Sequence, residues 1–195
     1  IGTTIDDALG EAFDKTAKLL GFGFPGGPEI EKFSKKGDAK RFLLPKPIIN
    51  RGGCNLSFAG LKTAVLRNKI FIKTIKDKYD LAASFQATIM EIIYKKTKLA
   101  IKEFRQNTKG EKLVVAGGVA ANKEIRKIIK KLCLEENFKP YFPIDKLCGD
   151  NAAMIAITGL KKFKKRKFDK LDFPVKPRWA LDNKAKFLKG SGIKL

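Results

Sequence analysis

The sequence predicts an α/β protein built on a parallel βαβα core. Residues 113–116 form a short apolar run rich in β-branched residues, which is typical of a strand buried on both faces. Two glycines permit a tight turn after this run, and a helix with an apolar stripe follows Asn122, a favourable N-cap. Residues 138–142 then predict a second strand, and a second helix starts at Asp150, where an acid can cap it.

The first element of the chain is predicted to be an amphipathic helix. A capping-box pattern over residues 4–7 starts it, and Gly21 ends it. The side opposite the apolar stripe carries three acids in succession: Asp7, Glu11 and Asp14. Acids at this spacing repel one another. The pattern therefore predicts a cation or ligand hydroxyls beside the helix, unless nearby lysines pair with the acids.

The segment after this helix mixes turns, short helices and extended pieces. Residues 24–28 predict a rigid turn of prolines and glycines, and residues 29–36 predict a short helix. Residues 41–49 and 55–58 predict two strands around a glycine turn, with prolines that favour the edge of a sheet. Another helix starts at Gly60.

The longest helical pattern covers residues 80–104. Its apolar residues recur at helical spacing and predict a side buried in the core. The members of this side are Leu81, Phe85, Ile89, Ile92, Ile93 and Leu99. We interpret the stripe as core packing.

Composition limits the class of protein. With 44% hydrophobic and 32% charged residues over 195 positions, the sequence is typical of a soluble globular protein. No apolar run reaches the roughly 20 residues that cross a bilayer. Three well-separated cysteines favour a reducing cytoplasm, and the absence of histidine excludes His-based triads and His-ligated metal centres within this chain. Because the chain starts at Ile1, we expect a fragment that lacks an N-terminal half.

The net charge of +22 is concentrated toward the C-terminal end. Residues 161–195 carry 13 Lys or Arg against three acids, which are Asp169, Asp172 and Asp182. Such an excess favours a polyanionic partner, with nucleic acid first. The segment is predicted to bind RNA by counterion release, without reading bases. The alternative is an ordinary solvated lysine surface.

The two predicted caps point to a site. Asn122 and Asp150 each start a helix just after a strand, so both lie at the carboxyl edge of a right-handed parallel unit, where α/β proteins bind ligands. No G-x-G-x-x-G follows a strand here. The pattern therefore suits a nucleotide site between two lobes, of the actin, Hsp70 and sugar-kinase type, better than a Rossmann site.

Several motifs carry a resemblance to one family. In order, they are the segment 5–21, PGGP at 25–28, SFAGLKT at 57–63, AGGVAAN at 116–122, GDNAAM at 149–154 and KPRW at 176–179. Together they resemble the successive motifs of the universal tRNA threonylcarbamoyladenosine transferase family (TsaD type), which has the actin-like ATPase fold. The resemblance spans residues 5–181.

The resemblance implies an activity and a site. The family moves a threonylcarbamoyl group from threonylcarbamoyl-AMP to N6 of the adenosine beside the tRNA anticodon. Carried over by motif, the residues that would contact the nucleotide or adenylate are Asp14, Gly27, Asn122, Glu11 and Glu31. Asp150 would be a ligand of the catalytic iron or zinc. The implied partners are tRNA and other subunits of the threonylcarbamoyl transfer complex, in the cytoplasm and without a membrane.

One family motif is missing. The other metal ligands of the family are two histidines in a His-x-x-x-His motif of an N-terminal lobe, and this chain has no histidine. We therefore expect a C-terminal part of the enzyme over residues 1–181, a basic flexible tail over 182–195, and an N-terminal half that is lost or supplied as a separate chain. Two alternatives stay open: a fragment of another actin-like ATPase or kinase, and a non-catalytic basic module that binds tRNA.

Overall fold

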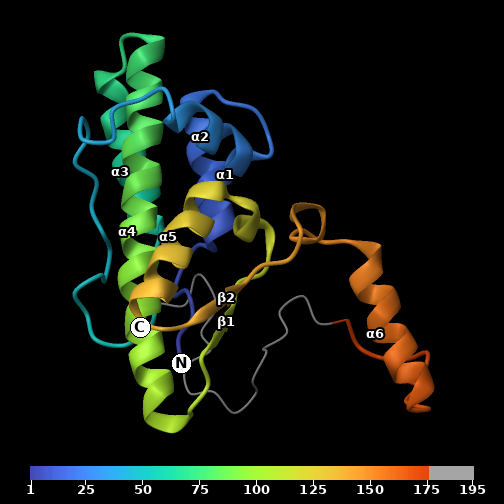
Figure 1. The fold of residues 1–195 in the computed structure, drawn as a ribbon. Coiled ribbons are helices and arrows are strands. Elements are labelled where there is room, and N and C mark those ends of the chain that lie inside the picture. The colour runs from blue at the N-terminus through green and yellow to red at the C-terminus, as the bar shows by residue number, and fades with distance from the viewer. Residues whose placement is uncertain (176–195) are drawn as a thin grey trace.

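The structure is a computed structural model that describes residues 1–175 (Figure 1). Its helices are α1 (Leu9–Leu20), α2 (Gly26–Ser34), α3 (Ala59–Asn68), α4 (Ile75–Asn107), α5 (Lys123–Glu135) and α6 (Ala152–Lys164). Its strands are β1 (Lys112–Val114) and β2 (Lys139–Tyr141), and three short 3-10 helices are η1 (Lys69–Phe71), η2 (Gly118–Ala121) and η3 (Asp145–Leu147). The expected boundary at residue 181, the basic tail and the motif at 176–179 lie outside the described residues.

The two strands pair in parallel, as predicted for the βαβα core. Leu113 lies opposite Pro140, and α5 makes the connection between the strands. The prediction of a strand buried on both faces is wrong for the described residues. Leu113 packs against the core, whereas Val114 is 69% exposed. With only two strands, the sheet has one face covered by the helices, and nothing in residues 1–175 covers the other.

The long helix α4 is the central support of the fold. It packs against α1, α2, α3 and α5, and runs the full height of the molecule in Figure 1. The predicted core side is confirmed at Leu81, Phe85, Ile89 and Ile92, and Phe85 meets Phe13 of α1 edge to face at 5.3 Å. Leu99 is the exception. Its side chain is 37% exposed, whereas Ile101, two residues later, is 3% exposed, so the buried side of α4 lies at other positions in its last turns.

The two strands predicted at 41–49 and 55–58 do not form. Residues 41–49 have no regular structure beyond a turn, and the second segment contributes only a parallel bridge between Leu56 and Thr4. The physical reason lies in the prolines. Pro45 and Pro47 have no N–H to donate to a neighbouring strand, and Ile48 adopts a φ of 48°, which interrupts extended backbone.

Helix α1 starts later than the capping-box pattern predicts. The Thr4 hydroxyl donates to the carbonyl of Asp7, and the first helical residue is Leu9. The side chain of Asp6 instead serves a distant helix, because its Oδ1 accepts from the N–H of Phe58 at 2.7 Å and of Ala59 at 3.2 Å. Asp6 therefore caps α3 and ties the start of the chain to it. Gly21 ends α1 as predicted, with a φ of 74°.

Helices α2 and α6 also differ from their predicted starts. Helix α2 begins at Gly26, inside the segment predicted as a turn. The cap of α6 is Asn151, whose Oδ1 accepts from the N–H of Met154 at 3.1 Å, and not Asp150. Every residue of α6 is exposed, and the helix projects away from the rest of the described chain in Figure 1. No helix among residues 1–175 is long and apolar enough to cross a membrane.

The start of α4 predicts a pH dependence. The Oδ2 atom of Asp77 accepts from the N–H groups of Lys73 at 2.8 Å and Thr74 at 2.6 Å, and its other oxygen pairs with Arg41. The two backbone bonds, with a smaller contribution from Arg41, lower the pKa of Asp77 to about 2. Because the folded pKa lies below the unfolded value, this stabilisation is complete above about pH 4 and is lost as the pH falls toward 2.

Replacing Asp77 with asparagine should therefore flatten the fall in the free energy of unfolding between about pH 4 and pH 2. Urea unfolding at a series of pH values measures it. Asp169→Asn is the control, since it removes the same charge from the exposed surface. If Asp77→Asn and the unsubstituted chain lose stability in parallel over this range, Asp77 is not the titrating group.

Candidate functional site

A cavity of about 630 Å³ opens between α1, α2 and the segments that follow the two strands. Four of the residues carried over by motif line it together: Asp14, Gly27, Glu31 and Asn122. They come from three separate parts of the sequence, and the fold brings them together in the lining of this cavity. Glu11 and Asp150 do not line the cavity, although Gly149, the neighbour of Asp150, does.

Asp14 is fixed by the close approach of α1 and α2. Its Oδ1 accepts from the N–H of Gly26 at 2.7 Å, at the first residue of α2. A methyl group at Gly26 would lie 2.6 Å from the Cα of Asp14, so only glycine lets the helices come this close. The carboxylate also lies at the positive end of α2, where a negative charge is stabilised.

Asn122 is held at both ends of its amide. Its Oδ1 accepts from the N–H groups of Glu124 at 3.1 Å and Ile125 at 3.0 Å, which makes it the predicted N-cap of α5. Its Nδ2 donates to Oε1 of Gln86 on α4 at 3.2 Å. Because Oδ1 is committed to the cap, the orientation of the amide is determined, and one Nδ2 hydrogen is left for a ligand.

Gln86 was not predicted as part of the site. It is 3% exposed, and its Nε2 has no hydrogen-bond partner within the described residues. A buried amide donor without a partner costs stability. Its only side-chain hydrogen bond among residues 1–175 goes to Asn122. No sequence signal distinguishes Gln86 from the other residues of α4, because the contact spans 36 positions.

Glu31 joins the two sides of the cavity. Its Oε2 accepts from the N–H of Lys123, the first residue of α5, at 3.1 Å, and its Oε1 pairs with Lys35 at 3.4 Å. The carboxylate of α2 thus lies at the positive end of α5, where the helix dipole favours it. One side chain therefore stabilises the approach of both helices to the cavity.

The loop after β2 is tied to α5 by Arg126. Its Nη2 donates to the carbonyl of Pro143 at 2.8 Å and to Sγ of Cys148 at 3.2 Å, and it pairs with Asp145 at 2.9 Å. These contacts bring Asp145 and Cys148 into the lining of the cavity. They were not predicted from the sequence, because nothing in the spacing of this loop distinguishes it from an ordinary connection.

The lining has a definite chemical character. It contains three carboxylates, which are those of Asp14, Glu31 and Asp145, and no Lys or Arg. Apolar surface comes from Phe13, Pro25, Pro28 and Val119. Carboxylates accept hydrogen bonds from hydroxyl and amino groups, and apolar walls accept the faces of a base. The cavity therefore suits the base and sugar of a nucleoside better than its phosphates, which three carboxylates would repel.

Several glycines of the cavity lining have empty space beside their Cα atoms. A methyl group added at Gly27, Gly118 or Gly149 would meet no atom within 4 Å. Gly117, in the turn before η2, adopts a φ of 95°, which favours glycine. The strand, glycine turn and capped helix predicted from the sequence are thus confirmed as local structure.

The acid row on α1 is neutralised within the chain. Lys15 pairs with Asp7 at 2.9 Å and with Glu11 at 2.6 Å, and Asp14 is engaged by Gly26. The hydrogen bond from Lys15 lowers the pKa of Glu11. A cation is therefore not needed to hold these acids together. Glu11 lies exposed beside α1, one turn from Asp14.

The metal ion that the resemblance implies does not fit the described residues by themselves. Asp150 is exposed, and no group of three His, Cys, Asp or Glu among residues 1–175 is placed to hold an ion. A transition metal needs several such ligands. Asp150 by itself offers one, so residues 1–175 do not form a complete metal site.

Comparisons with known proteins agree on one family. The model of the family described as tRNA N6-adenosine threonylcarbamoyltransferase matches residues 1–157. A curated protein of that name from Pelagibacter ubique (strain HTCC1062) is 64% identical over 197 residues, covering 100% of this chain and 55% of the relative. A second, from Rickettsia peacockii (strain Rustic), is 50% identical over 188 residues, covering 94% of this chain and 55% of the relative.

A third relative of the same name, from Ruegeria pomeroyi (strain ATCC 700808 / DSM 15171 / DSS-3), is 45% identical over 201 residues. The match covers 100% of this chain and 55% of that relative. The chain therefore spans about half the length of the curated relatives it matches. The similarity runs through all the elements that surround the cavity, since the matched range includes α1, α2, η2, α5 and η3.

Proposed function

Because the chain belongs to the tRNA N6-adenosine threonylcarbamoyltransferase family, we propose that it forms the nucleoside-binding part of such an enzyme. The reaction would transfer the threonylcarbamoyl group from threonylcarbamoyl-AMP to N6 of the adenosine beside the tRNA anticodon. The substrates would be the adenylate and tRNA, and the other subunits of a threonylcarbamoyl transfer complex would be partners in the cytoplasm. The fold would be that of an actin-like ATPase, with this chain forming one side of its cleft.

The observation that supports this proposal is that Asp14, Gly27, Glu31 and Asn122 line the same cavity. The two carboxylates would accept hydrogen bonds from the ribose hydroxyls. The free Nδ2 hydrogen of Asn122 would donate to the adenylate, and the open backbone at Gly27 would allow close approach. Glu11, exposed beside α1, would act at the rim of the cavity.

Asp150 would supply one oxygen ligand to an iron or zinc ion, at the edge of the cavity next to Gly149. The remaining ligands would come from residues that this chain does not contain, which accords with the absence of histidine. The role of this chain would be to bind and orient the nucleoside.

Nucleotide binding tests the proposal. Adenosine should bind this chain more tightly than AMP or ATP, because the lining offers no cation to the phosphates and its three carboxylates repel them. Asp14→Asn and Glu31→Gln should each weaken adenosine binding by roughly 10- to 150-fold, since a charged hydrogen bond contributes about 1.5–3 kcal/mol. Isothermal titration calorimetry measures both effects.

Glu29→Gln is the matched control, because it changes the same charge on α2 at a residue outside the lining. It should leave the affinity for adenosine unchanged. An adenosine affinity that is unchanged in the double variant Asp14→Asn, Glu31→Gln would refute the proposal that these carboxylates bind the nucleoside.

A non-catalytic RNA-binding module is the second candidate, favoured by the net charge of +22. Assays of threonylcarbamoyl transfer to tRNA, with the remaining part of a relative and its partner subunits added, separate the two. Transfer that depends on this chain supports the enzyme, whereas RNA binding without any transfer supports the module. A fragment of an unrelated ATPase or kinase is not supported by the family match.

A further inference from the structure

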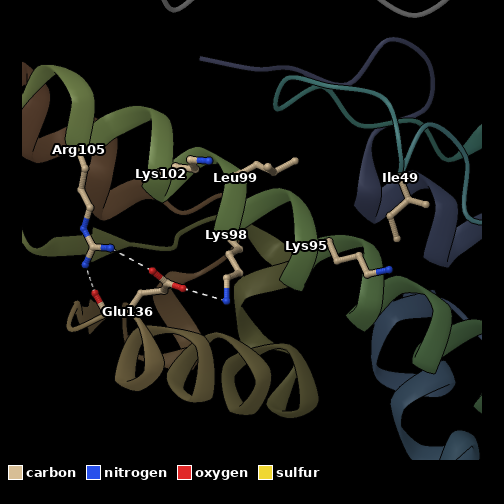
Figure 2. Close-up of a pocket in the computed structure, with 7 residues that line it drawn as sticks. All are labelled: Ile49, Lys95, Lys98, Leu99, Lys102, Arg105 and Glu136. Atoms are coloured by element: carbon tan, nitrogen blue, oxygen red, sulfur yellow. Dashed lines mark hydrogen bonds and ion pairs between the residues drawn. The ribbon is translucent and has the colours of Figure 1, made fainter.

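A second groove, separate from the cavity above, lies along the last turns of α4 and has a volume of about 460 Å³ (Figure 2). Four of its seven lining residues are cations, and all four come from α4: Lys95, Lys98, Lys102 and Arg105. Their spacings of three, four and three residues place them on one face of the helix. At a rise of 1.5 Å per residue, they form a line about 15 Å long.

Three of the four cations have ion pairs that leave some of their donors unused. Glu136, the only carboxylate in the lining, pairs with Lys98 at 3.0 Å and with Arg105 at 3.0 Å, as Figure 2 shows. Lys95 pairs with Glu91 outside the groove at 3.1 Å, and Lys102 has no ion pair within residues 1–175. Since Lys has three donors and Arg has five, each head keeps donors for a ligand.

The floor of the groove is apolar. Leu99, which the sequence predicts as core, is partly exposed between the cations, and Ile49, from the irregular segment after α2, also lines the groove. The lining thus combines a line of cations with apolar side chains. This combination suits a polymer that repeats an anionic group along a less polar chain. Phosphates along a nucleic-acid strand have this character, and positive charge along a line is the usual footprint of their binding.

We propose that this groove binds the phosphodiester backbone of RNA. The choice of RNA rests on the function proposed above, in which tRNA is the acceptor, and on the excess of 42 Lys or Arg over 20 Asp or Glu in the chain. The contacts of the groove are to phosphates, which position the strand but carry no sequence information. It contributes affinity and orientation to a tRNA whose reacting adenosine lies elsewhere.

Two double substitutions test the proposal. Lys98→Gln with Lys102→Gln removes two charges from the groove, and Lys127→Gln with Lys130→Gln removes two charges from the exposed side of α5 as the matched control. Binding of a tRNA transcript is titrated at several salt concentrations. The groove variant should weaken binding and reduce the log–log salt slope by roughly 0.7–0.9 for each phosphate that it no longer neutralises. The control should change both much less.

Equal losses in the two variants would overturn the proposal, since they would reflect total charge alone. So would a groove variant that loses binding of polyglutamate and keeps that of RNA, which would assign the groove to an acidic protein. Failure of the unsubstituted chain to bind RNA at low salt would do the same. Adenosine binding, measured on the same variants, should not change; if adenosine binds none of them while the RNA result holds, the proposed nucleoside site fails and the groove remains.

Discussion

Replacing Gly26 with alanine is expected to lower the free energy of unfolding by about 1–3 kcal/mol, and by more if the helices cannot separate. The added methyl group would lie 2.6 Å from the Cα of Asp14 and 2.8 Å from both the Cβ of Ala17 and the carbonyl oxygen of Phe13. Two of these neighbours are backbone atoms, so a change of rotamer cannot relieve the contact. Helix α2 has to move away from α1, which also breaks the hydrogen bond between Gly26 and Asp14.

The neighbouring glycine provides the control. A methyl group at Gly27 would meet no atom within 4 Å, so Gly27→Ala should leave stability unchanged or raise it by up to about 1 kcal/mol through helix propensity. Since Gly27 lines the cavity, the same substitution should weaken adenosine binding. Urea unfolding and calorimetry of the two variants separate helix packing from ligand contact. Equal stability of the two variants would show that α1 and α2 are not in close contact at Gly26.

Local signals predict the core of this fold well. The strand at 113–116, its glycine turn, the Asn122 cap and the parallel second strand follow from periodicity and turn chemistry, which act over a few residues. The predicted strands at 41–49 and 55–58 do not form, because a strand depends on more than the residues within it. Each would need a partner strand, and the prolines of the first remove the donors that such a partner would use.

The candidate site could be predicted only in part. Motif resemblance finds Asp14, Gly27, Glu31 and Asn122, which line one cavity in the structure. Nothing local predicts Asp145 or Gln86, because Arg126 and Asn122 reach them across 19 and 36 positions in the chain. The exposure of Leu99 was also missed, because periodicity assigns one buried side to the whole helix, whereas Lys96 and Ile101 are buried on either side of an exposed Leu99.

The contact between Gln86 and Asn122 predicts the second large effect. Asn122→Ala removes the N-cap of α5, worth about 0.5–2 kcal/mol, and leaves Oε1 of Gln86 buried without a donor, at a further cost of about 1–3 kcal/mol. The free energy of unfolding should therefore fall by more than the loss of a cap alone. Urea unfolding measures the loss.

Gln86→Met distinguishes the two contributions. In the unsubstituted chain it deprives Nδ2 of Asn122 of its acceptor, so it should be neutral to mildly destabilising. In the Asn122→Ala background the same substitution should stabilise, because it replaces a buried amide that no longer has a partner with an apolar side chain of similar length. The opposite signs correspond to a coupling free energy of about 1 kcal/mol or more.

Thr88→Val is the matched control for this cycle. Thr88 is a buried polar residue of the same helix, and its hydroxyl donates to the carbonyl of Ser84 at 2.8 Å, away from Asn122. Its effect should add to that of Asn122→Ala within about 0.5 kcal/mol. If Gln86→Met costs the same stability in both backgrounds, the amide of Asn122 is not held by Gln86.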